Sequence, residues 1–166
     1  MSGPFHPVHL HPVHPVAMTH DPAAMTRDLS TLPAQRPSLY RLAADGRSLD
    51  FLFAQCPACQ ALSFPANAPG CMHCGQAIDA SAQVLRPGGG TLLEYVTLHL
   101  ALAPGLPVPG IVGDIRIADR VVQQGLIAVD DESRLHPGMA LRARAQPLAS
   151  GDGYGCVFVP DRQAAQ

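Results

Sequence analysis

Four cysteines in two close pairs constrain this chain more than any other feature of its sequence. Cys56 and Cys59 form one C-x-x-C pair, and Cys71 and Cys74 form a second pair after eleven intervening residues. Zinc prefers four tetrahedral ligands, and a C-x-x-C turn lets two thiolates reach one ion. Two such turns predict a structural zinc site with no vacant position. Iron in the same cage and a redox dithiol are the alternatives.

The metal is expected to replace a hydrophobic core in this segment. A stretch of roughly thirty residues cannot bury enough apolar surface to fold unaided. Structural zinc contributes on the order of 10–16 kcal/mol of apparent binding free energy in small peptides. His73 lies inside the second pair, but Cys74 already has the ligand spacing, so we expect His73 to stay outside the metal site.

The charge distribution argues against nucleic acid as a partner. The formal net charge is −2, the chain has no lysine, and no arginine occurs between Arg47 and Arg86. A nucleic-acid reader needs Arg or Lys to contact phosphates and base edges. The cysteine segment therefore lacks the residues that a DNA-binding zinc finger uses.

The residues before the cysteines divide into two parts. Residues 1–34 are rich in proline and histidine and are expected to form a disordered tail. Residues 35–49 predict a short helix, with Ser38 as its N-cap and Gly46 at its C′ position. Such a short helix is marginal in water, so we expect it to dock on this chain or on a partner.

The residues from the cysteines onward predict a mainly β protein. We assign residues 50–80 to a zinc ribbon and residues 81–162 to a small barrel. Short segments of alternating or β-rich sequence, separated by Gly- and Pro-rich turns, indicate an antiparallel barrel. The five expected strands cover residues 91–102, 111–119, 120–129, 140–148 and 156–160.

No grouping of residues in the sequence supports catalysis by this chain alone. The remaining nucleophile or base candidates are His99, His136 and Cys156. Cys156 lies in an apolar strand, which favours a buried and inert thiol. The sequence shows no Ser/His/Asp or Cys/His arrangement and no phosphate-binding glycine loop.

The order of these parts resembles a family of zinc-ribbon/OB-fold proteins associated with acyl-CoA metabolism. The resemblance spans roughly residues 36–160. It is carried by DFLFAQCPACQALSFP (50–65), CMHCG (71–75), GGGTLLEYVTLH (88–99) and LHPGMALRARAQ (135–146). It implies a rubredoxin-like ribbon followed by a five-stranded OB-fold barrel.

The resemblance also implies a function and site residues. Family members look like non-catalytic partners of thiolase-fold enzymes, which hold the complex together and help to shape the acyl-CoA site. It implies zinc ligands at Cys56, Cys59, Cys71 and Cys74, and a partner-docking segment at Leu39, Tyr40 and Leu42.

Two departures from the family pattern are visible. Gln60 stands where the family often has glycine after the second cysteine, and a left-handed backbone there costs a non-glycine residue roughly 1 kcal/mol. A basic residue is missing after Phe64-Pro65. Arg142 and Arg144, on the polar face of the fourth barrel strand, are therefore the better candidates for residues near CoA, with a solvated strand face as the alternative.

We thus expect a zinc-binding accessory subunit of a thiolase-like acyl-CoA enzyme. An OB-fold nucleic-acid-binding module and a stand-alone acyl-CoA-binding protein remain the alternative functions. The chain contains no run of 18 apolar residues, which argues against a membrane span. Paired cysteines with a bound metal suit the reduced cytoplasm better than a disulfide scaffold.

Overall fold

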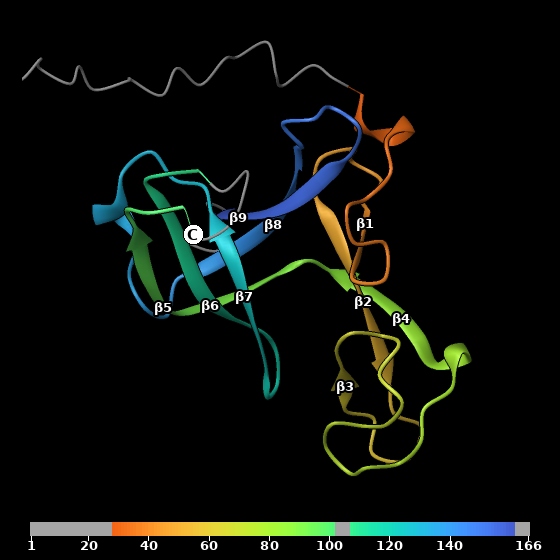
Figure 1. Cartoon of the computed structure of the whole chain (residues 1–166). Coiled ribbons are helices and arrows are strands. Elements are labelled where there is room, and N and C mark those ends of the chain that lie inside the picture. Colours follow the sequence, from red (N-terminus) through yellow and green to blue (C-terminus); the bar gives the residue numbers. More distant parts are fainter. Residues whose placement is uncertain (1–27, 102–106, 162–166) are drawn as a thin grey trace, which may run out of the picture.

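A computed structural model describes residues 28–101 and 107–161 of the chain. The described part is mainly β, as expected (Figure 1). Strands β1 (Tyr40–Leu42), β2 (Leu49–Gln55), β3 (Leu62–Ser63) and β4 (Gln83–Pro87) form one sheet. Strands β5 (Gly89–Leu98), β6 (Gly110–Ala118), β7 (Val121–Ile127), β8 (Ala140–Pro147) and β9 (Tyr154–Pro160) close into a barrel, in the order β5-β6-β7-β9-β8. The described helical elements are the 3₁₀ turns η2 (Leu29–Thr31), η3 (Ala80–Ala82) and η4 (Glu132–Arg134).

The five-stranded barrel confirms the prediction for the C-terminal half. Its strand pairs are antiparallel except for β7 and β9, which meet in parallel at Ile127 and Phe158. Alternate residues point inward, as a strand's period of two requires, so Leu92, Ile115 and Ala143 are fully buried. Strand β5 pairs with β8 over Gly89–Thr91 and with β6 from Thr91 onward, and the β5–β6 pairing contains a bulge between Leu92 and Glu94.

The sheet of the ribbon is larger than the sequence indicates. Strand β2 pairs with β1 and β3 along one edge and with β4 along the other, where Asp50 to Ala54 face residues 83–87. Strand β4, which follows the expected boundary between residues 80 and 81, therefore pairs with the ribbon sheet. The barrel strands begin only at Gly89.

A glycine joins the two parts. The backbone N–H of Gly88 donates to the carbonyl of Leu49 (2.7 Å), and the carbonyl of Gly88 accepts from the N–H of Ala143 (2.9 Å). A Cβ atom at Gly88 would lie 2.5 Å from the Leu49 carbonyl oxygen, so only glycine fits between β2 and β8. The rings of Phe51 and Phe158 pack edge to face, with 6.1 Å between their centroids. The ribbon and the barrel thus share one core.

The predicted helix over residues 35–49 is wrong. Its second half forms a β-hairpin, in which β1 and β2 pair Tyr40 with Phe51. The carboxylate of Asp45 accepts hydrogen bonds from the N–H groups of Arg47 (2.9 Å) and Ser48 (2.7 Å), and Gly46 has φ +67°. Pairing with β2 buries Tyr40, and this tertiary gain outweighs a weak local preference for helix.

The expected tail is also shorter than residues 1–34. Residues 28–34 pack on the barrel, where Leu29 is buried and Ala34 forms a parallel bridge with Tyr154. The N–H of Gln35 donates to the carbonyl of Tyr154 (2.8 Å), and the N–H of Tyr154 donates to the carbonyl of Pro33 (3.1 Å). Residues 1–27 lie outside the described residues.

Within the described ranges, no helix is long and apolar enough to cross a bilayer.

Candidate metal centre and the junction cleft

The two C-x-x-C turns have the same backbone hydrogen bonds. In the first turn the N–H of Gln60 donates to the carbonyl of Cys56 (2.9 Å), and in the second the N–H of Gly75 donates to the carbonyl of Cys71 (2.9 Å). Each turn is closed by one more bond, because Cys56 donates to the carbonyl of Ala61 and Cys71 donates to that of Gln76.

Both turns end in a left-handed residue. Gly75 has φ +76°, which glycine adopts without cost, and Gln60 has φ +60°. The strained backbone expected at Gln60 is therefore confirmed. The Gln60 side chain offsets part of this strain, because its Nε2 donates to the carbonyl of Pro57 (3.1 Å) and its Oε1 accepts from Gln55 (3.2 Å).

The four cysteine sulfurs form a compact cluster. All four lie within 4.8 Å of one another, and the closest pairs, Cys56 with Cys74 and Cys59 with Cys71, are 3.6 Å apart. A tetrahedron with Zn–S bonds of about 2.3 Å has S···S edges of about 3.8 Å. The residues therefore fit a four-thiolate structural zinc site, with Cys56 and Cys71 buried and the other two exposed.

Backbone N–H donors change the pKa values of two of the cysteine thiols. The N–H groups of Cys74 and His73 point at the sulfur of Cys71 and lower the pKa of that thiol to about 6. At Cys59 the N–H of Ala61 favours the thiolate, but desolvation and the neighbouring sulfurs together raise the pKa to about 12. A divalent ion held by these four cysteines would supply the positive charge that stabilises all four thiolates.

His73 and Ser63 contribute to the site in ways that the cysteine spacing does not reveal. The ring of His73 is not part of the sulfur cluster, but its backbone N–H lies 3.3 Å from the sulfur of Cys71. The hydroxyl of Ser63, which is fully buried, accepts a hydrogen bond from the N–H of Met72 (3.0 Å). Ser63 thereby ties the second cysteine turn to strand β3.

The three proposed docking residues do not form one exposed face. Tyr40 is only 4% exposed, because its ring packs against Tyr154, and its burial raises the pKa of its phenol. Leu39 and Leu42 are half-buried against the same core. The N–H of Leu42 donates to the Tyr154 hydroxyl (3.2 Å). Tyr40 is therefore an internal residue rather than a docking residue.

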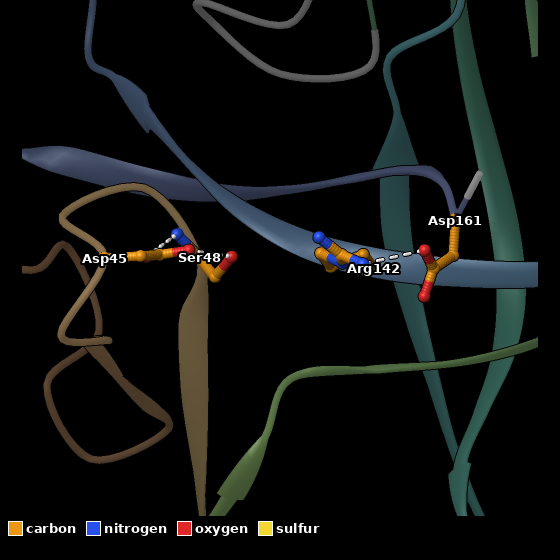
Figure 2. Close-up of polar contacts among 4 residues, drawn as sticks. All are labelled: Asp45, Ser48, Arg142 and Asp161. Carbon is orange, nitrogen blue, oxygen red and sulfur yellow. Dashed lines mark hydrogen bonds and ion pairs between the residues drawn. The ribbon is translucent and has the colours of Figure 1, made fainter. Parts of the chain in front are cut away.

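Arg142 and Arg144 both lie on β8, and Arg142 lines a cleft at the junction. Arg142 forms an ion pair with Asp161 at 2.8 Å (Figure 2). Arg144 lies near Asp45, whose pKa is lowered mainly by the Ser48 hydroxyl and further by this guanidinium. The buried Nε of Arg144 has no hydrogen-bond partner among the described residues. The cleft has a volume of about 530 Å³, and its lining includes Ser48, Asp50, Gly88, Gly89, Gly90, Arg142 and Asp161.

Most of this lining carries no recognisable signal in the sequence. The Gly-rich run at 88–90 is a recognisable signal for close backbone approach, and it does form the cleft floor. Asp161 and Ser48 carried no such signal, because they reach the cleft only through the pairing of β2 with β4 and of β8 with β9.

The candidate nucleophile and bases stay apart. Cys156 lies on β9, and desolvation raises the pKa of its thiol to about 12, so it is protonated at neutral pH. His99 and His136 are exposed, and the His136 ring contacts only the carbonyl of Pro137 among the hydrogen bonds of the described residues. None of these hydrogen bonds joins Cys156 to a histidine.

Comparison with known proteins identifies both parts of the chain. Residues 43–78 match the model of the ChsH2 rubredoxin-like zinc ribbon domain, and residues 83–146 match that of the ChsH2 C-terminal OB-fold domain. A solved structure described as "Ltp2-ChsH2(DUF35) aldolase" contains a chain with the same fold. It has a TM-score of 0.54 and 21% identity, and the match covers 67% of this chain and 84% of that one. No curated protein matches the chain significantly.

Proposed function

Because the chain belongs to the ChsH2 family of zinc-ribbon and OB-fold proteins, we propose that it is a non-catalytic accessory subunit of a thiolase-like acyl-CoA enzyme. In this role it organises the complex and one side of the acyl-CoA site, and the partner carries out the chemistry. The observation that carries the proposal is a closed four-cysteine site next to a barrel whose described residues contain no nucleophile–base pair.

The metal in this proposal is structural. Cys56, Cys59, Cys71 and Cys74 would hold one zinc ion, and four protein ligands leave no position for a substrate or for water. The ion would fix the two turns and the exposed residues within them, among them Met72. Reduced thiols that hold a metal are typical of cytoplasmic proteins, which supports a cytoplasmic location.

The acyl-CoA would lie at the junction cleft, at an interface shared with the partner. Arg142 is the better candidate of the two arginines for a phosphate contact, because it lines the cleft and its guanidinium pairs with Asp161 at the cleft wall, whereas Arg144 lies outside the lining and its Nε is buried. The fold relative described as an Ltp2-ChsH2 aldolase supports an enzyme as the partner. Leu39 and Leu42, half-buried at the edge of the ribbon sheet, remain candidates for contact with that enzyme.

A nucleic-acid-binding OB-fold is a weaker candidate. Such domains bind oligonucleotides across their second and third strands, which are β6 and β7 here. The outward side chains of this region include Asp114 and its cross-strand neighbour Glu94, with Arg116 as the only arginine on β6. Phosphate groups would meet two carboxylates there.

Coexpression with the thiolase-like protein encoded nearest to this chain tests the proposal. We expect a tagged chain to retain that protein through affinity and size-exclusion steps, and we expect thioester cleavage or formation only when both are present. The Arg142→Ala variant should still copurify but should raise the KM for acyl-CoA. Elution of the two proteins apart, with full activity of the enzyme alone, would contradict the accessory role. Activity of this chain alone, or a salt-sensitive complex with single-stranded DNA, would support the alternatives.

A further inference from the structure

The outer face of strands β5, β6 and β7 carries an ordered pattern of side chains that neither the metal site nor the junction cleft uses. One cross-strand row is apolar, because Val96 lies opposite Val112 and Val112 lies opposite Leu126. Val96 is 56% exposed, and the other two are partly exposed. The apolar row is continuous across three strands and lies open to solvent among the described residues.

The next row on the same face is acidic. Glu94 lies directly opposite Asp114, and Asp114 lies opposite Gln124. Carboxylates placed directly across a strand pair repel each other and destabilise the sheet. No hydrogen bond or ion pair is found for either carboxylate within residues 28–101 and 107–161. Arg116 is two residues further along β6 on the same face, and it forms no ion pair with Asp114.

The two rows meet in a shallow pocket of about 230 Å³. Glu94, Asp114 and Gln124 form its polar side, and Val96 and Val112 form its apolar side. An arginine side chain matches this combination, because its methylene stem covers apolar surface while its guanidinium donates hydrogen bonds to carboxylates in a planar, directional geometry. Arginine is also among the residues that most often dominate the binding energy of protein interfaces.

We propose that this face is a docking surface for a protein segment that carries an arginine flanked by apolar residues. The guanidinium enters the pocket between Glu94 and Asp114, and the flanking side chains lie on Val96, Val112 and Leu126. Charge complementarity selects this occupant, since a bound cation removes the repulsion between the two carboxylates. The proposal holds whether or not the partner is a thiolase-like enzyme.

A short peptide tests the surface directly. The probe is the capped tripeptide Val-Arg-Val, and the matched peptide has glutamine in place of arginine. On titration into the zinc-loaded full chain at low salt, we expect amide NMR shifts to change together at residues 94–96, 112–114 and 124. The glutamine peptide should bind about tenfold more weakly, the difference that a charge-assisted hydrogen bond typically makes.

Two charge variants complete the test. Asp114→Asn should weaken binding of the arginine peptide about tenfold, whereas Asp119→Asn removes an equal charge from the β6–β7 turn and should leave binding unchanged. The melting temperature of Asp114→Asn should equal or exceed that of the wild type, since repulsion with Glu94 is relieved, so a binding loss cannot be assigned to unfolding. Equal binding of both peptides, shifts at other residues, no shifts at all, or self-association through this face would overturn the proposal.

Discussion

The tip of the zinc ribbon and the barrel differ in what holds them together. Between Cys56 and Gly75 the buried side chains are two of the four cysteines together with Ser63, Phe64 and Ala66. The barrel instead buries large aliphatic and aromatic residues from each of its strands, such as Leu92, Ile115 and Phe158. Strand β2 belongs to both, because it leads into the first cysteine turn while Leu49, Phe51 and Phe53 pack in the shared core. Metal binding thus stabilises the ribbon tip and apolar packing stabilises the adjacent barrel. Each of the two contributions can be removed by its own substitution.

Loss of a metal ligand should have the largest effect and should stay local. Cys56→Ser is expected to abolish stoichiometric zinc binding and to unfold residues 56–75, because the ion contributes on the order of 10 kcal/mol in such sites. Strand β2 and the barrel should stay folded on their shared core. Zinc per chain by mass spectrometry and amide NMR peaks measure the two effects.

Cys156→Ser is the matched control for this experiment, since Cys156 lies outside the sulfur cluster. It should retain one zinc per chain. If Cys56→Ser keeps its zinc, Cys56 is not a ligand, and if the barrel peaks vanish as well, the two parts are not separable.

A cavity in the barrel core should destabilise the barrel rather than the tip of the zinc ribbon. Leu92 is fully buried, and Leu92→Ala is expected to lower the free energy of unfolding by about 2–5 kcal/mol. Leu85→Ala on β4 removes the same atoms from a side chain that is 49% exposed and should cost far less. Urea denaturation of the two zinc-loaded variants compares them, and equal losses would show that the barrel core is not centred on Leu92.

The two left-handed residues allow the cysteine turns to be compared with each other. Gly75→Ala is expected to cost about 1 kcal/mol, because a Cβ there meets no atom within 4 Å and only the backbone is strained. Gln60→Gly relieves the same strain but loses the bond to Pro57, so its net change should be smaller. Zinc competition with a chelator reports both effects, and tighter binding by Gly75→Ala would refute the strain argument.

An effect of similar size concerns the pH dependence of barrel stability. The folded-state pKa of Cys156 is about 12, raised by desolvation from an ordinary 9.0. The buried neutral thiol therefore contributes fully to the stability of the folded state below about pH 9. This contribution is lost as the pH rises from 9 toward 12, because in that range the thiol ionises in the unfolded chain but stays protonated in the folded one. Between pH 8 and pH 10 the wild type should lose about 1 kcal/mol relative to Cys156→Ala. Parallel pH profiles of the two proteins would show that the thiol is not desolvated.

The sequence was sufficient for features that are local. Cysteine spacing predicts the metal site, alternation and turn residues predict the five barrel strands, and the position of Gln60 predicts its left-handed backbone. Each of these depends on residues within one turn or one strand, where the physical constraint is visible in the pattern.

Features that depend on distant partners were missed. Residues 40–42 form a strand only because β2 pairs with them and Tyr154 covers Tyr40. The Asp45-Gly46 pair is a hairpin signal that the sequence does contain, but the spacing of Leu39 and Leu42 also suits a helix. Strand β4 is assigned to the ribbon sheet by its pairing with β2, which no local pattern in residues 83–87 reveals.

Tyr154 has a consequence for how the chain is made. Its backbone forms hydrogen bonds with residues 33 and 35. Its hydroxyl accepts a hydrogen bond from the N–H of Leu42, a contact between residues 112 positions apart in the sequence. During synthesis the N-terminal hairpin leaves the ribosome long before β9 exists, so its apolar side must wait for almost the whole chain to emerge. Closing such distant contacts is slow. The N-terminal hairpin is therefore covered only after the last strand, β9, has been synthesised. A ribosome stalled before residue 154 would carry a chain whose first hairpin is exposed.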